Sequence, residues 1–437
     1  MSSPATGKTN GPVELDALVI GAGFAGLYQL YRLRDRLGLT VRALEAAGGI
    51  GGTWFWNRYP GARCDSESHV YWYTFSLELM REWEWSERYP SQAEILRYLN
   101  FVADKFDLKR DIRFRTRVTS AHYDEAANRW HVRTDTGETF IAKYLVTAVG
   151  CLSTANVPAI PGLEMFKGDW YHTGQWPHEG VDFAGKRVGM IGTGSTGIQA
   201  APVIAAQAKH LTVFQRTANY SVPARNVPLT ADFKQYVKDN AGEIRATTHQ
   251  TYNGMGFKVQ ERKAVDTPPE ERERIYEAAW ERGGLQFRAS FQDMLISKEA
   301  NDTAADFIKS KIRSIVKDPK TSAVLSDIDH PYAAKRPADR YQLFRDLQSA
   351  ERHARRREGC ANPADLGDGN PHGGGGVSRR HHCFRDRVRC DDRTAAQDGH
   401  SRTGRHRAEA CLGGRTAQLP RPAGRWFSEP VHHHGAR

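Results

Sequence analysis

Two glycine-rich stretches have the spacing needed to bind a diphosphate. Residues 21–26 read Gly-Ala-Gly-Phe-Ala-Gly, and residues 192–197 read Gly-Thr-Gly-Ser-Thr-Gly. In such a loop the first glycine allows a tight turn, the second lets the backbone approach a pyrophosphate, and the third lets the next helix pack closely on its strand. The N–H groups at the helix N-terminus then face the phosphates. A chain with two such loops can bring a flavin and a nicotinamide together.

The side chain that ends the second strand of each unit predicts which nucleotide the loop binds. Residues 41–44 lead to Glu45, whose carboxylate can accept hydrogen bonds from ribose hydroxyls and repels a 2′-phosphate. Residues 211–215 lead to Arg216 and Thr217 with no acid, and a guanidinium can pair with a 2′-phosphate in a forked geometry. The first loop is therefore predicted to bind FAD or NAD, and the second NADP. Alternatively, Arg216 is an arginine at the end of a strand that is exposed to water and binds no phosphate.

The elements that must position these loops can be read on both sides of each glycine run. Residues 15–20 are rich in strand formers, and apolar positions recur with helical spacing over 27–37. Residues 186–191 again predict a strand, followed by a helix from Ile198, and residues 144–150 predict a further strand. Strand, glycine turn and helix in this order predict two Rossmann-like α/β units. A chance glycine motif in a surface turn would lack these flanking elements.

A third glycine run, residues 48–52, leads into an aromatic segment with Trp54, Phe55 and Trp56. Such a sequence suits a loop that closes over a flat ring system. An aromatic-rich core loop would have the same composition, so the sequence leaves both open.

Charge is distributed unevenly along the 437 residues. Residues 337–437 contain 19 arginines, no lysine and 12 acidic residues, so most of the net charge of +11 arises there. The excess of basic over acidic residues therefore predicts neither a nucleic-acid nor a membrane partner for the rest of the chain. Cys64 and Cys151 are the only cysteines before this tail, and no run approaches the length of a membrane span. We expect a cytoplasmic, monomeric enzyme without a metal.

The most specific segment lies between the two loops. Residues 166–177 read Phe-Lys-Gly-Asp-Trp-Tyr-His-Thr-Gly-Gln-Trp-Pro. With this segment in place, residues 13–336 resemble the Baeyer–Villiger monooxygenases, the FAD- and NADPH-dependent oxygenases of ketones such as cyclohexanone and phenylacetone. Related N-hydroxylating and dimethylaniline-type flavin monooxygenases usually have Tyr or Phe in place of Trp176. Residues 51–65 and 214–223 also look like Baeyer–Villiger sequence.

The resemblance implies a cofactor-binding role for particular residues. On the FAD side it implies Gly21, Gly23, Gly26, Glu45, Gly52, Thr53, Trp54, Asp65 and Tyr71. On the NADP side it implies Gly192, Thr193, Gly194, Ser195, Thr196, Gly197, Arg216, Thr217 and Lys335.

The resemblance also implies the catalytic groups. Arg336 matches the family's active-site arginine, and Asp65 matches its carboxylate partner. FAD reduced by NADPH would bind O₂ at C4a, and the anionic peroxyflavin would attack a ketone to give an ester or lactone. A fixed cation stabilises that negative charge, and arginine keeps its proton. His172 would lie in a linker between domains and act in domain movement rather than in proton transfer.

The expected organisation has four parts. Residues 1–12 are a flexible N-terminus, 13–155 the first FAD-binding segment, and 156–336 the NADP-binding domain, with a helical insertion at about 230–316. Residues 337–437 do not follow the family. The large aromatic side chains of the insertion are expected to form its core rather than to contact substrate: Trp280, Phe287 and Phe291.

Back-translation offers an explanation for the tail, which lacks strand or helix periodicity. Permitted codons for residues 381–393, read one base later, give TIVFATGFDAMTG, which looks like the family's flavin-contacting strand. Residues 340–348 and 424–435 give DTNYFETFN and AGFPNLFTITG in the same frame and in family order. We hypothesise a frameshift near residues 336–337, with a genuine basic tail as the alternative. The chain as printed then lacks its second FAD segment and is expected to fold poorly or to hold FAD weakly.

Two alternatives to ketone oxygenation stay open at this point. One is an N- or S-oxygenating flavin monooxygenase, and the other is an inactive remnant that binds NADP only. A disulfide reductase also uses two dinucleotide loops, but it needs a redox CxxC, which the chain does not contain.

Overall fold

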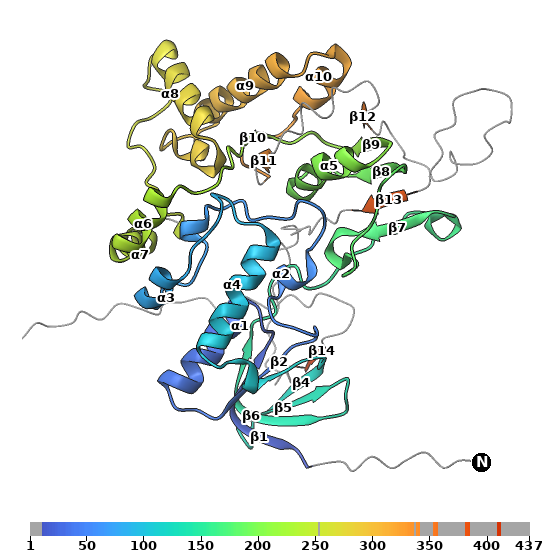
Figure 1. Cartoon of the computed structure of the whole chain (residues 1–437), viewed down its shortest axis with the longest axis vertical. Coiled ribbons are helices and arrows are strands. Elements are labelled where there is room, and N and C mark those ends of the chain that lie inside the picture. Colours follow the sequence, from blue (N-terminus) through green and yellow to red (C-terminus); the bar gives the residue numbers. More distant parts are fainter. Residues whose placement is uncertain are drawn as a thin grey trace, which may run out of the picture.

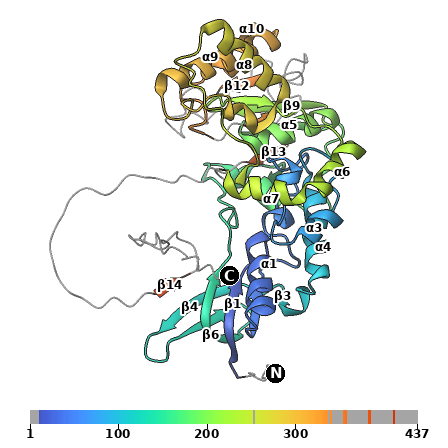
Figure 2. The ribbon, with the colours of Figure 1, turned by 90° about the vertical axis from the view of Figure 1, so that its left-hand side faces the viewer.

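The computed structural model describes residues 11–251 and 254–335, together with short strands at 338–340, 353–356, 381–384 and 409–411. Figure 1 shows an elongated arrangement of these elements. The sheet that contains β1 and β6 lies at one end, helices α8, α9 and α10 lie at the other, and α5 with β8 and β9 lies between them. Figure 2 shows the same order from the side. The two glycine loops therefore belong to different units that follow one another along the molecule.

The first unit is built on a sheet with the strand order β14-β4-β5-β6-β1-β2-β3. β1 pairs in parallel with β2 and with β6, whereas β4, β5 and β6 form an antiparallel meander. Ala17, Leu18 and Val19 of β1 are fully buried, because a central parallel strand is covered on both faces. The strands are β1 (Val13–Ile20), β2 (Val41–Leu44), β3 (Ile112–Arg113), β4 (Val118–Asp124), β5 (Arg129–Thr134), β6 (Thr139–Thr147) and β14 (Glu409–Cys411).

The end of β6 differs from the sequence-based expectation. The prediction of a strand over 144–150 is wrong for its last three residues, because β6 ends at Thr147. Ala148 N donates to Ile20 O across the sheet, and the chain then leaves it at Gly150, whose φ of +70° no extended strand adopts. The strand instead begins earlier, at Thr139.

α1 packs on β1 and β2 of this sheet, and α2 contacts α4 (Figure 1). The predicted helix over 27–37 starts earlier, at Phe24, and continues after Tyr31 as a π-helical turn, Arg32–Arg36. α4 is amphipathic and buries Ile95, Tyr98, Leu99 and Val102. The helices are α1 (Phe24–Tyr31), α2 (Thr53–Trp56), α3 (Leu77–Glu82) and α4 (Gln92–Lys105), with 3-10 turns at Ser68–Val70 and Lys109–Asp111.

The second unit has the strand order β12-β9-β8-β13-β7, and every neighbouring pair in it is parallel. The predicted strand–turn–helix order is present, with α5 (Ser195–Gln207) between β8 and β9. The strands are β7 (Asp169–His172), β8 (Arg187–Ile191), β9 (His210–Gln215), β12 (His353–Arg356) and β13 (His381–Phe384), with 3-10 turns at Leu163–Met165 and Thr173–Gln175.

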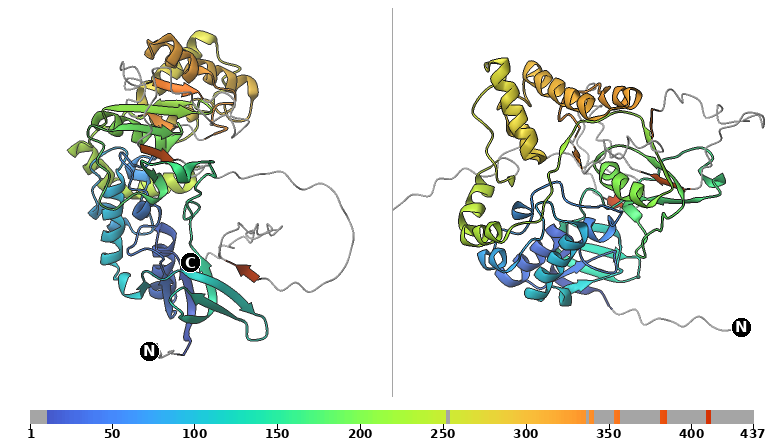
Figure 3. Two further views of the ribbon diagram at one scale, coloured as in Figure 1. Left: turned by 90° about the vertical axis from the view of Figure 1, so that its right-hand side faces the viewer. Right: turned by 45° about the horizontal axis from the view of Figure 1, so that its top comes forward.

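Helices α8, α9 and α10 follow the second unit, and Figure 3 shows them beyond the second sheet, whereas α6 and α7 lie beside α3 of the first unit (Figure 1). Trp280, Phe287 and Phe291 are all buried and pack around Tyr276 and Phe307, which confirms that they form a core. The elements are β10 (Ser221–Pro223), α6 (Ala231–Asp239), α7 (Ala241–Gln250), α8 (Pro269–Arg282), a 3-10 segment Gly284–Ala289, α9 (Lys298–Ile315), α10 (Pro319–Ser326) and β11 (Ala338–Arg340), which pairs with β10.

Candidate functional site

The first glycine loop connects β1 to α1 in the geometry that its sequence predicts. A Cβ placed on Gly26 would lie 1.9 Å from Gly21 O, so helix and turn are as close as backbone allows. Gly23 is the N-cap residue of α1, and no side chain caps this helix. By contrast, α4 and α9 are capped by Ser91 and Ser297. The first N–H groups of α1 therefore stay available for an anion such as a pyrophosphate.

The third glycine run lies directly on this loop. Gly51 N donates to Ala22 O at 3.0 Å, and a Cβ on Gly52 would lie 3.1 Å from Gly23 Cα. A larger residue at position 52 would push the two loops apart. Thr53, the next residue, is exposed and opens α2.

Aromatic side chains form a wall beside the first loop. Trp54 is buried, and its Nε1 donates to Tyr71 Oη at 3.1 Å. The Tyr71 ring lies edge-on to Trp54 and to Phe24, with centroids 5.8 and 5.3 Å apart. The structure thus brings together the predicted flavin-side residues 52–54 and Tyr71. These contacts agree with both interpretations of the aromatic segment, a loop that closes over a flat ring and a core loop, since Trp54 also belongs to the core of the first unit.

Glu45 lies at the carboxyl end of β2 and is anchored against the first loop. Its Oε2 accepts from Ala22 N at 2.7 Å, and its Oε1 accepts from Ala47 N at 2.8 Å. The side chain is 6% exposed. Each carboxylate oxygen has a second lone pair, so these two bonds fix the carboxylate in place and leave capacity for ribose hydroxyls.

The second loop repeats the geometry of the first. A Cβ on Gly197 would lie 2.4 Å from Gly192 O, and Gly194 precedes α5 as an N-cap residue that provides no side-chain cap. Thr193, Ser195 and Thr196 are half-buried along the loop and the first turn of α5. This helix N-terminus is thus a second available anion site.

Cationic side chains lie at the end of β9. Arg216 is exposed, and Thr217 beside it is half-buried. His330 Nε2 lies 3.2 Å from Asn219 Oδ1, and Lys335 Nζ lies 3.4 Å from His330 Nδ1. Lys335 is thereby linked through His330 to Asn219, three residues beyond Arg216, and a shared role of the two cations in binding a 2′-phosphate stays a prediction.

Asp65 lies where the first unit touches α5. It is 4% exposed, and its Oδ1 accepts from Gln199 Nε2 at 2.7 Å. Its expected partner Arg336 lies outside the described residues, so their pairing stays a prediction. Gln199 was not predicted from the sequence. Its signal was a polar residue within the apolar run Ile198 to Ala201.

His172 ends β7 and is 5% exposed. Its Nδ1 accepts from Gly174 N at 3.1 Å, which fixes the turn that follows the strand. Trp176 packs beside it against Tyr171 and Phe183. Residues 172–176 thus hold the chain in place where it enters the second unit. A role of His172 in domain movement stays a prediction.

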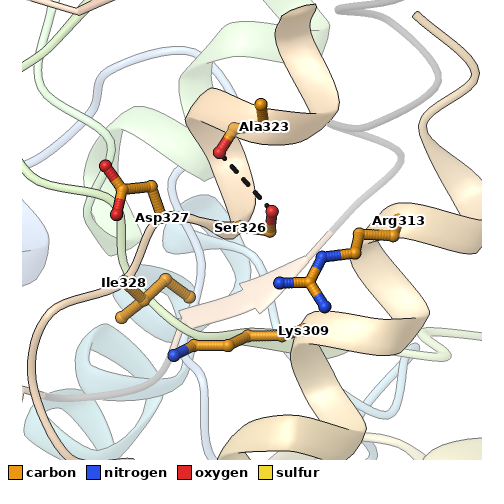
Figure 4. Close-up of a pocket in the computed structure, with 6 residues that line it drawn as sticks. All are labelled: Lys309, Arg313, Ala323, Ser326, Asp327 and Ile328. Atoms are coloured by element: carbon orange, nitrogen blue, oxygen red, sulfur yellow. Dashed lines mark hydrogen bonds between the residues drawn. The ribbon is translucent and has the colours of Figure 1, made fainter. Parts of the chain in front are cut away.

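A cavity of about 390 Å³ lies elsewhere, between α9 and α10 (Figure 4). It is lined by Lys309, Arg313, Ala323, Ser326, Asp327 and Ile328. None of these is a predicted site residue, so this cavity is separate from the two loops. Within the described ranges, no three His, Cys, Asp or Glu side chains gather as metal ligands would, and no helix is long and apolar enough to cross a membrane.

Comparison with known proteins identifies relatives with this arrangement. Residues 16–227 match the family model described as flavin-binding monooxygenase-like. A Baeyer–Villiger monooxygenase of Pseudooceanicola batsensis is 51% identical over 76% of this chain and 60% of its own length. A phenazine N-monooxygenase of Lysobacter antibioticus is 44% identical over 77% of this chain and 62% of its own. The chain therefore spans about 60% of the length of these relatives.

Solved structures agree with these matches. Oxidised steroid monooxygenase bound to NADP is 50% identical, with a TM-score of 0.76 over 79% of this chain and 66% of that one. An open crystal structure of cyclohexanone monooxygenase is 42% identical, with a TM-score of 0.76 over 79% of this chain and 67% of that one. The chain belongs to the family of Baeyer–Villiger monooxygenases, within the flavin-binding monooxygenase-like proteins.

Proposed function

We propose that the protein is an FAD- and NADPH-dependent monooxygenase that uses O₂ to insert one oxygen next to a ketone carbonyl, giving an ester or lactone. One observation carries the proposal: two uncapped glycine loops lie in one chain, with a buried carboxylate, Glu45, beside the first and cations beside the second. This contrast fits a nucleotide without a 2′-phosphate in the first loop and NADP in the second.

The described residues fit these cofactors. When bound, FAD supplies the activation of O₂, and NADPH supplies the electrons. Glu45 would orient the ribose of FAD, and Trp54 and Tyr71 would cover its flat ring. Arg216 and Lys335 would hold the 2′-phosphate of NADP by charge-assisted hydrogen bonds.

Two residues are proposed to act on the substrate side. Arg336 would stabilise the negative charge that develops on the carbonyl oxygen when the ketone is attacked. Asp65 would hold that guanidinium without removing its charge. His172 would act in domain movement.

We also propose the division into 13–155 and 156–336 with a frameshift after it. The match to the relatives supports this, because about a quarter of this chain and about 40% of each relative stay unmatched. A tail in the family's frame would extend the alignment. Sequencing the gene across codons 330–345 tests it, and an uninterrupted frame that encodes the printed tail, with the matching intact mass, would disprove it.

The experiment that tests the activity compares the frame-corrected protein with the chain as printed. Each receives FAD, NADPH, O₂ and cyclohexanone, and the products are identified by mass spectrometry. Caprolactone formation supports the proposal. A phenazine is assayed in parallel because of the relative from Lysobacter antibioticus. An N-oxide from the phenazine, with no lactone, would favour the second candidate function, N-oxygenation.

The remaining proposals are coarser. We propose a monomer in the cytoplasm that binds small molecules and neither nucleic acid nor membranes. The charge distribution supports this, since most of the positive charge lies in residues 337–437. Size-exclusion chromatography with light scattering tests the oligomeric state, and a dimer would contradict it.

A further inference from the structure

The side-chain amide of Gln199 connects the two units through hydrogen bonds. Gln199 lies in α5 and is 3% exposed, and its side chain reaches out of the second unit to residues 59–65 of the first. Its Oε1 accepts from Tyr59 Oη at 2.8 Å and from Arg63 N at 3.3 Å. Its Nε2 donates to Arg63 O at 3.1 Å and to Asp65 Oδ1 at 2.7 Å. These four bonds use the full capacity of a primary amide.

The orientation of this amide is unambiguous. Arg63 N can only donate, and Arg63 O can only accept, so the two must face the oxygen and the nitrogen of Gln199 respectively. The nitrogen is thereby directed to Asp65. A neutral donor fixes the carboxylate while leaving its charge available for a cation.

The backbone shows the same close contact. A Cβ on Gly61 would lie 2.3 Å from Gln199 O, and Gly61 has a φ of +77°. Only glycine lets the 59–65 segment lie this close to α5. Segment and helix are therefore held together through both side chain and main chain.

The helix that carries Gln199 also carries the second glycine loop. Gln199 is two residues beyond Gly197, about 3 Å along the helix axis. A helix turn of this length moves as a rigid element, so a nucleotide that orders the loop also orders the amide.

We propose that Gln199 is a positioning residue that couples the second dinucleotide site to the Asp65 carboxylate. Occupancy of the loop at 192–197 then steadies residues 59–65 in the first unit. The inference rests on the proposed function only in taking NADP as the ligand of this loop.

Hydrogen–deuterium exchange on the purified chain, with NADP⁺ as the probe, tests the proposal. Slower exchange at 192–198 reports that NADP⁺ has bound. In the wild-type chain, NADP⁺ is expected to slow exchange at 59–65 as well. In Gln199→Met, which keeps the size of the side chain, NADP⁺ still binds but the slowing at 59–65 disappears. Without nucleotide, exchange at 59–65 is expected to be about tenfold faster in this variant, because buried hydrogen bonds are lost.

Two further variants sharpen the test. Gln207→Met changes an exposed glutamine at the other end of α5 and should behave as wild type. Gln199→Asn keeps the amide but is one methylene shorter, so it cannot reach all four partners and should also lose the coupling.

The exchange rates distinguish a failure of the coupling from a failure of the proposed function. Slowing at 192–198 without slowing at 59–65 in the wild-type chain overturns the coupling, whatever the variants do. Equal slowing at 59–65 in Gln199→Met also overturns it. A wild-type chain that binds no NADP⁺ contradicts the proposed function instead. The inference is then judged without nucleotide, where equal exchange at 59–65 in wild type and Gln199→Met overturns it.

Discussion

At the scale of single residues, the two loops differ chiefly in the charge beside them. Glu45 is buried and fixed by two backbone N–H groups, so its charge cannot move away from a bound nucleotide. Arg216 is exposed and free to meet a phosphate that arrives from solvent. A buried anion excludes the extra phosphate, and an exposed cation attracts it.

Replacing Arg216 with Ala is expected to weaken NADP⁺ binding by roughly 10- to 100-fold, the usual worth of a charge-assisted hydrogen bond. Binding of NAD⁺, which lacks the 2′-phosphate, should change little. Isothermal titration calorimetry with both nucleotides measures this. Arg133→Ala, an exposed arginine on β5, is the control. Equal losses for NADP⁺ and NAD⁺ would show that Arg216 does not contact the 2′-phosphate.

His69 gives the stability of the chain a pH dependence. Burial lowers the pKa of His69 below its usual 6.5, and this outweighs Glu67, whose carboxylate lies 3.6 Å away and acts to raise it. The unfolded chain therefore binds more protons at His69 than the folded chain does. The contribution of His69 to the free energy of unfolding is thus lost as the pH falls below about 6.5. His69→Gln should flatten this loss in urea unfolding between pH 7 and 5. His122→Gln on β4, an exposed histidine, should leave the slope unchanged. An unchanged slope in His69→Gln would contradict the assignment.

The sequence predicted single residues where a motif specifies both type and place. Glu45 was found because it follows the second strand of a glycine-loop unit, and the structure places it against the loop. Gln199 was missed, because its partners lie 134 or more residues away along the chain and no local pattern predicts such contacts. Arg336 lies outside the described residues and remains a prediction.

At the scale of elements, both loops depend on glycines that leave no room for a side chain. A Cβ on Gly26 would lie 1.9 Å from Gly21 O, which belongs to the rigid turn of the same loop. The matching contact at Gly197 is 2.4 Å. Neither backbone oxygen can rotate away as the end of a flexible side chain can.

Gly26→Ala and Gly197→Ala are each expected to destabilise the fold by about 1–3 kcal/mol, the usual cost of overpacking. Urea unfolding measures this. Gly242→Ala in α7 is a matched control, because a Cβ there meets nothing within 4 Å, and it should be neutral or stabilising. Destabilisation of the same size by all three substitutions would show that the close contacts are not the cause. FAD retention should fall only in Gly26→Ala, and NADP⁺ affinity only in Gly197→Ala.

The strands and helices around the loops could be predicted because periodicity and glycine turns are local signals. The start of α1 was missed by three residues, because Phe24 to Gly26 belong to both the glycine motif and the helix. The end of β6 was misplaced, since the apolar run continues past Thr147 while the backbone turns at Gly150. Local composition does not show where pairing stops.

At the scale of the whole molecule, large apolar side chains are exposed where the first unit ends. Between residues 144 and 157, in β6 and in the segment that follows it, they are Tyr144, Val149, Leu152 and Val157. Exposed apolar side chains of this size favour association when they gather in a patch that no other segment covers. A second FAD segment in the family's frame is our proposed cover.

One strand of the tail lies in the second unit and therefore does not supply this cover. The backbone of His381–Phe384 forms β13 between β7 and β8. Read one base later, permitted codons for these residues give Thr-Ile-Val-Phe, a sequence that suits an internal strand better than the printed one. The frame-corrected protein is therefore expected to melt at a higher temperature and to bind less of a hydrophobic dye than the chain as printed. Equal melting and equal dye binding would contradict the frameshift.

The most direct test of the central claim is the reaction of the frame-corrected protein, purified with its flavin, with NADPH, O₂ and cyclohexanone. The account predicts FAD bound near one per chain, and caprolactone formed only when NADPH is present. Bound FAD and oxidised NADPH with no ester or lactone from any ketone tested, or oxygen delivered only to nitrogen or sulfur, would contradict it.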